Sequence, residues 1–151
     1  MRQKHFERGS SMVEFAFAAM ALFLVLFGII EFGRMLYTYH TVSNAARLGA
    51  RWAMVRGTAS CSGAVGKQLS ACPANQNEVQ SFVQSQVTLL GPGTLTVTAT
   101  WPGGNAGCNS ADSHAAPCVV VVTASHDFTF LIPFVGTKLT IASTSKMDIA
   151  Q

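Results

Sequence analysis

An uncharged apolar run near the N-terminus constrains this chain more than any other feature. Residues Phe15–Ile30 carry no charged side chain, and extending the run back to Ser10 gives 21 residues with one charge, on Glu14. A membrane-spanning helix needs about 20 mostly apolar residues. Only 11% of all residues are charged, against about 25% in an ordinary soluble domain. The sequence therefore predicts one transmembrane helix, and Glu31 and Arg34 mark the membrane face at its C-terminal end.

The residues before this run allow three interpretations. A secretory signal peptide needs a small-residue cleavage site after the apolar run, and EFGRMLYTYH contains none. A plain signal anchor explains the hydrophobicity but not the position of Glu14. The third interpretation is a basic leader that is cut between Gly9 and Ser10, which resembles the signal of prepilin peptidases. Glu14 would then be the fifth residue of the mature chain, and this interpretation accounts for the most features.

The distribution of charge indicates the orientation and argues against nucleic acid. Residues 1–56 hold seven Lys and Arg against three acids, whereas residues 57–151 hold three against four. Cations before a span favour a cytoplasmic N-terminus. The distal region lacks the basic stripe that a nucleic-acid-binding surface requires. We therefore expect the region after the span to lie outside the cytoplasm.

All four cysteines follow the apolar run, at positions Cys61, Cys72, Cys108 and Cys118. An even number on one side of a membrane predicts disulfides in an oxidising compartment. Proximity favours the local bonds Cys61–Cys72 and Cys108–Cys118, although four cysteines allow three pairings and the sequence does not choose among them. A metal site is not expected, because there is no C-x-x-C pair.

A helix is predicted to continue well beyond the membrane. No proline occurs before Pro73, and a helix over about Ser11–Arg56 would end at Gly57 as a C-terminal cap. Its second half carries small residues at four-residue spacing on one face, namely Ala45, Ala46, Gly49, Ala50 and Ala53. This face could pack on the helix's own domain or on another subunit, and both alternatives stay open at this point.

The remaining sequence predicts a short helix and three strands. Asn75, followed three residues later by Glu78, is a helix start signal, and apolar residues continue at helical spacing to Leu90. Alternating apolar and polar residues predict strands over 94–101, 118–130 and 138–149. We expect an α+β fold in which a small antiparallel sheet packs on the long helix.

Three regions follow from these elements. They are a leader over residues 1–9, a transmembrane and stalk helix over 10–57, and an extracytoplasmic, disulfide-containing α/β region over 58–151.

Two segments bring this chain close to a known family. The apolar segment VEFAFAAMALFLVLFGIIEFGR and the later NAARLGARWA are similar to the TadE family of the tight-adherence, or Flp-type, pilus system. The similarity covers about residues 8–57, and the pattern over Ala45–Arg51 is its more specific part. The two cysteine-bounded segments and the Gly-, Asn- and Ser-rich stretch 102–117 depart from a minimal member.

The resemblance implies a pilin-like fold and a structural role as a minor pilin or pseudopilin needed for pilus assembly. It also implies cleavage at Gly9–Ser10 and a pairing of Glu14 with the N-terminal ammonium group of a neighbouring subunit. The implied partners are the major Flp-type pilin, a TadF-like protein, the prepilin peptidase, the inner-membrane assembly platform and the lipid bilayer. The implied location is the bacterial inner membrane, with one span and a periplasmic C-terminal region; entry into the surface pilus is the other outcome left open.

Catalysis is not expected, and neither is a cofactor. Ser125, His126 and Asp127 are adjacent in a predicted strand, where successive side chains face opposite sides, so the histidine cannot reach both neighbours as a triad requires. The alternative function is a membrane-anchored adhesion or binding module that captures a ligand with the loop 102–117 and has no part in fibre assembly.

Overall fold

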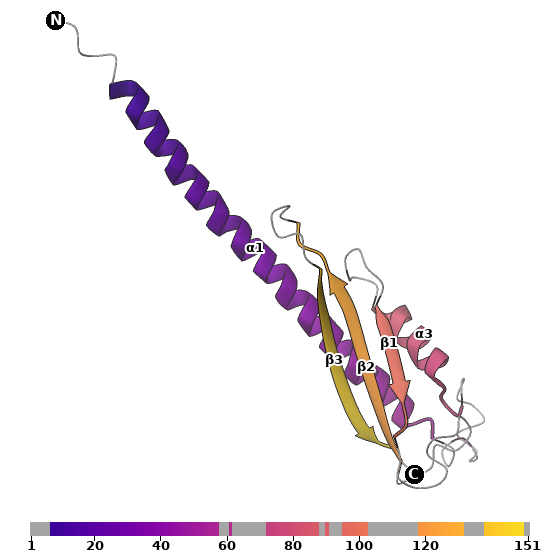
Figure 1. Cartoon of the computed structure of the whole chain (residues 1–151). Coiled ribbons are helices and arrows are strands. Elements are labelled where there is room, and N and C mark those ends of the chain that lie inside the picture. The colour runs from indigo at the N-terminus through magenta and orange to yellow at the C-terminus, as the bar shows by residue number, and fades with distance from the viewer. Residues whose placement is uncertain are drawn as a thin grey trace, which may run out of the picture. The chain divides into compact units, whose positions relative to one another are not determined.

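The computed structural model describes residues 7–57, 61, 72–87, 90, 95–102, 118–131 and 138–149. The chain divides into two compact units, Met1–Leu36 and Tyr37–Gln151. Its elements are α1 (Glu7–Met54), α3 (Gln76–Gln86), β1 (Thr96–Thr100), β2 (Val119–Phe128) and β3 (Leu139–Asp148) (Figure 1). The predicted α+β fold, with a long helix, a short helix and a three-stranded antiparallel sheet, is confirmed.

Helix α1 runs from Glu7 to Met54 and contributes to both units. It contains no proline, which would remove a backbone hydrogen bond and kink the helix. Arg51 lies in the last turn, where a positive charge favours the negative end of the helix dipole. The helix is followed by a turn in which the Arg56 N–H donates to the Ala53 carbonyl at 3.1 Å, so the predicted end near Arg56 and Gly57 is correct to within two residues.

Helix α3 begins at the predicted start signal, where Asn75 and Glu78 form a capping box. The Asn75 Oδ1 atom accepts a hydrogen bond from the Glu78 N–H at 3.0 Å, and the Glu78 Oε2 atom accepts one from the Asn75 N–H at 2.9 Å. These bonds satisfy two backbone donors at the start of the helix. The helix ends at Gln86, earlier than the predicted Leu90, because the backbone leaves the helical region at Val87, where φ is −110° and ψ is 80°.

The sheet has the order β1-β2-β3 and is antiparallel throughout. Thr98 lies opposite Thr123, and Thr123 lies opposite Thr144, where the hydroxyls of Thr123 and Thr144 are 3.0 Å apart. These threonines mark the outer face of the sheet. The inner face buries Leu95, Val97 and Ala99, which alternation in the sequence predicted. It also buries Val120, Val122 and Ala124 of β2.

The largest side chains in the core of the second unit come from four elements. The largest fully buried ones are all valines, namely Val42, Val79, Val83, Val97, Val120 and Val122. They come from α1, α3, β1 and β2, so these four elements enclose one core. Helix α3 lies beside β1 (Figure 1), where the Gln84 Nε2 atom donates to the Leu95 carbonyl at 2.8 Å.

Candidate functional site

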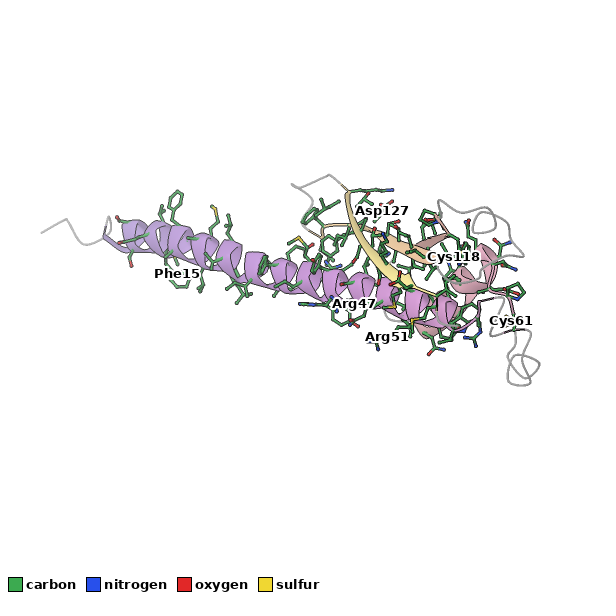
Figure 2. All side chains as sticks on the ribbon, turned by 90° about the horizontal axis from the view of Figure 1, so that it is seen from below. Phe15, Arg47, Arg51, Cys61, Cys118 and Asp127 are labelled. Atoms are coloured by element: carbon green, nitrogen blue, oxygen red, sulfur yellow. A yellow bond between two sulfur atoms is a disulfide. The ribbon has the colours of Figure 1, made fainter. Side chains whose placement is uncertain are left out.

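Large apolar side chains cover the first unit's helix and are exposed. In the range Met12–Phe32 they are Met12, Val13, Phe15, Phe17, Met20, Leu22, Phe23, Leu24, Val25, Leu26, Phe27, Ile29, Ile30 and Phe32. Figure 2 shows side chains, Phe15 among them, pointing outward from the helix. An apolar surface of this size marks contact with a membrane or a partner protein. By length and composition this helix could cross a membrane, as predicted.

The residues predicted for processing and assembly lie in the first turns of α1. Gly9 is the third residue of the helix, whose first turn has backbone N–H groups without intrahelical acceptors. Ser10 and Glu14 are both exposed. Glu14 is therefore accessible to a partner, while cleavage at Gly9 and the pairing of Glu14 stay predictions.

Glu31 and Arg34 form an ion pair within α1, at the end of the apolar run. The Arg34 Nη1 atom donates to both carboxylate oxygens of Glu31, at 2.9 and 3.1 Å. Residues three apart lie on the same side of a helix, so regular helical geometry already brings the two side chains together. The two opposite charges partly neutralise one another at the position where the apolar run of the helix ends and polar residues begin.

The small residues of the second half of α1 are buried within their own domain. Ala45, Ala46, Ala50 and Ala53 are no more than 1% exposed. A β-carbon placed on Gly49 would lie 2.9 Å from Val83 Cγ2, 3.0 Å from Val122 Cγ1 and 3.4 Å from Val79 Cγ1. The small face therefore packs on α3 and β2. Of the two alternatives left open by the sequence, the structure shows packing within the chain.

An aromatic and cationic stack, which the sequence did not indicate, lies near the end of α1. The rings of Trp52 and Phe82 are stacked, with centroids 5.1 Å apart and an interplanar angle of 21°. The Arg56 guanidinium lies 4.0 Å from the Trp52 ring centroid, and its Nη1 atom donates to the Trp52 carbonyl at 3.2 Å. Burial lowers the pKa of Arg56 from its ordinary value, and the Glu78 carboxylate acts in the opposite direction. The stack connects α1 to α3.

A disulfide joins Cys61 to Cys72, across a sequence separation of 11. Two backbone hydrogen bonds attach the ends of this loop to the turn that follows α1: the Cys61 N–H donates to the Gly57 carbonyl at 3.0 Å, and the Ala74 N–H donates to the Arg56 carbonyl at 3.1 Å. Cys118 is also disulfide-bonded. Its predicted partner Cys108 and the rest of 103–117 lie outside the described residues.

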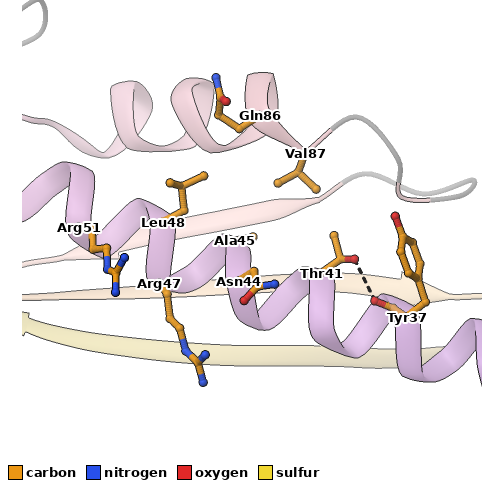
Figure 3. Close-up of a pocket in the computed structure, with 9 residues that line it drawn as sticks. All are labelled: Tyr37, Thr41, Asn44, Ala45, Arg47, Leu48, Arg51, Gln86 and Val87. Carbon is orange, nitrogen blue, oxygen red and sulfur yellow. Dashed lines mark hydrogen bonds between the residues drawn. The ribbon is translucent and has the colours of Figure 1, made fainter.

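A groove of about 510 Å³ lies beside α1 and the C-terminal end of α3. Figure 3 shows Leu48 and Val87 projecting into the gap between the two helices, and Arg47 and Arg51 extending from one side of α1. Tyr37 also lines the groove. The groove therefore combines an apolar base with two cations and one aromatic ring.

The adjacent residues Ser125, His126 and Asp127 do not form a catalytic triad. His126 is 4% exposed, on the inner face of the sheet. Asp127 is exposed, and its Oδ1 atom accepts a hydrogen bond from the Thr140 hydroxyl at 2.7 Å. Within the described ranges there is no group of three or more His, Cys, Asp or Glu side chains that could hold a metal ion.

These features define the class as an α+β protein whose N-terminal helix is long and apolar enough to cross a membrane. The family model described as "TadE-like protein" matches residues 9–51. The match begins at Gly9 and includes Glu14 and the whole Ala45–Arg51 pattern, so the resemblance to the TadE-like family is confirmed for this segment. Searches of curated proteins and of solved structures gave no significant match.

Proposed function

We propose that this chain is a membrane-anchored minor pilin or pseudopilin that is needed for assembly of a Flp-type, tight-adherence pilus. The match of residues 9–51 to the TadE-like family carries this proposal. The exposed apolar surface of Met12–Phe32 supports it, because a helix of this kind is stable only in lipid or packed against other helices.

In this role the N-terminus starts in the cytoplasm and a prepilin peptidase removes residues 1–9. The second unit then lies in the periplasm, where its disulfides can form. The apolar helix holds the subunit in the inner membrane, and its partners are the major Flp-type pilin, a TadF-like subunit and the assembly platform. The contribution of the chain is structural, not enzymatic.

The test is deletion of the gene in a strain that makes these pili, followed by complementation with the complete chain. We expect few or no surface pili in the deletion strain by electron microscopy, and recovery of normal numbers on complementation. Immunoblots of the major pilin show whether its synthesis is unchanged. Normal piliation in the deletion strain would remove the proposed function.

A further inference from the structure

Two arginines in the family-matched segment are not explained by packing within the second unit. Ala45, Ala46 and Ala50 are buried, and Gly49 contacts the valines of α3 and β2. Arg47 and Arg51, from the same pattern, are exposed. Neither forms an ion pair with any described residue. Like charges four residues apart on a helix repel one another weakly, and an acidic group that approached both arginines would relieve this repulsion.

The surroundings of these arginines resemble the centre of a protein interface. Both line the groove of about 510 Å³, together with Tyr37, Leu48 and Val87. Leu48 is 36% exposed and Tyr37 is 51% exposed. Tyrosine and arginine are enriched in protein interfaces. A simple inorganic anion would need the two cations but not the apolar base.

The spacing of the arginines indicates the geometry of the ligand. Residues four apart on a helix are separated by about 6 Å along its axis. Guanidinium groups pair with carboxylates through two parallel hydrogen bonds. A helix that lies along α1 and carries two acids four residues apart offers carboxylates at the same spacing.

We propose that this groove docks an acidic helix of a partner protein. Two carboxylates of that helix, four residues apart, pair with Arg47 and Arg51, and an apolar side chain beside them packs on Leu48 and Val87. This binding concerns the second unit alone and does not depend on the proposed role in pilus assembly.

The test measures peptide binding to the full chain in neutral detergent by fluorescence anisotropy. The probe is a labelled, alanine-rich helical peptide with two glutamates four residues apart and a leucine beside them. A second peptide of identical composition has its glutamates two residues apart, on different faces of the helix. The variant Arg47→Gln/Arg51→Gln is compared with Lys138→Gln/Lys146→Gln, which removes the same charge from exposed positions in and beside β3.

We expect the native chain and the lysine variant to bind the first peptide alike and more tightly than the second peptide. In the arginine variant the dissociation constant for the first peptide should rise about tenfold or more, as for loss of central interface residues. Equal affinity for the two peptides, equal weakening in both variants, or unchanged binding by the arginine variant would each overturn the proposal.

Discussion

Gly49 and Val83 are in such close contact that a β-carbon on residue 49 would lie 2.9 Å from the Val83 Cγ2 atom. Alanine is normally the better helix former, by about 1 kcal/mol. At this position we expect Gly49→Ala to lower the free energy of unfolding by about 1–3 kcal/mol, since an overpacked core must distort. Val83 is fully buried and has a stiff, β-branched side chain, so it cannot move aside easily.

Urea unfolding in detergent, followed by tryptophan fluorescence, measures this effect, because Trp52 and Trp101 both belong to the second unit. Gly33→Ala is the matched control: a β-carbon there meets no atom within 4 Å. This control should leave the unfolding of the second unit unchanged. A Gly49→Ala variant as stable as the native chain would contradict the close packing.

The Cys61–Cys72 disulfide closes a short loop at the end of α1. Closing a loop of this size should stabilise the folded state by about 2–4 kcal/mol, through restriction of the unfolded chain. We therefore expect Cys61→Ser/Cys72→Ser to lower the free energy of unfolding by roughly this amount. Comparing the double variant with the native chain, both under oxidising conditions, checks the value. A loss below about 0.5 kcal/mol would indicate that the unfolded chain gains little freedom when this bond is absent.

The stack of Trp52 on Phe82 connects two elements that are far apart in sequence. We expect Trp52→Ala to lower the free energy of unfolding by about 2–4 kcal/mol. Replacing a fully buried tryptophan by alanine costs about 3–5 kcal/mol, and the expected loss is somewhat smaller because Trp52 is half-buried. Trp52→Phe keeps a stacked ring and should cost less than about 1.5 kcal/mol. Thermal unfolding followed by circular dichroism distinguishes the two variants. Equal destabilisation by both would show that stacking on Phe82 is not the stabilising contact.

The sequence predicted those features whose cause is local. The Asn75 and Glu78 pair is a signal within one turn, and it forms a capping box. Alternation placed Val97 and Ala99 on the buried face of the sheet. It also placed Leu139 there, together with Ile141, but Leu139 is the first residue of β3 and is 43% exposed, whereas Ile141 is buried.

Features that depend on contacts between distant residues were not predictable from one sequence. The four-residue spacing around Gly49 identified a face of small residues, yet it could not identify Val83 and Val122 as the groups that cover this face. Trp52 and Phe82 are thirty positions apart and belong to no common pattern. Arg47 and Arg51 belong to the pattern over Ala45–Arg51, but the groove that they line also requires Gln86 and Val87 at the end of α3.

Processing is expected to occur between Gly9 and Ser10 if the chain is a prepilin. Mass spectrometry of the protein extracted from membranes should detect a mature chain that begins at Ser10. A Gly9→Leu variant should keep residues 1–9, because a bulky side chain hinders the close approach of a protease to the backbone. An intact leader on the native protein, in cells whose major pilin is processed, would contradict this prediction.

Glu14 provides the sharpest test of the assembly role, since it is an exposed carboxylate within an otherwise apolar stretch. An ionisable residue in a membrane segment is a functional candidate by default. Glu14→Gln keeps the size of the side chain and removes its charge, so membrane insertion should be at least as efficient as in the native chain. If the carboxylate pairs with a neighbour's N-terminal ammonium, the variant loses a charged hydrogen bond of about 1.5–3 kcal/mol. The affinity between neighbouring subunits should then fall roughly tenfold or more, since each 1.4 kcal/mol is a factor of ten, and the number of surface pili should fall with it. Ser11→Ala, a polar change one turn earlier, is the matched control and should leave piliation unchanged. Electron microscopy counts the surface pili, and immunoblots of the membrane fraction measure how much of each variant is inserted. Together they distinguish failed assembly from failed insertion. Normal piliation with Glu14→Gln would show that this charge has no part in assembly.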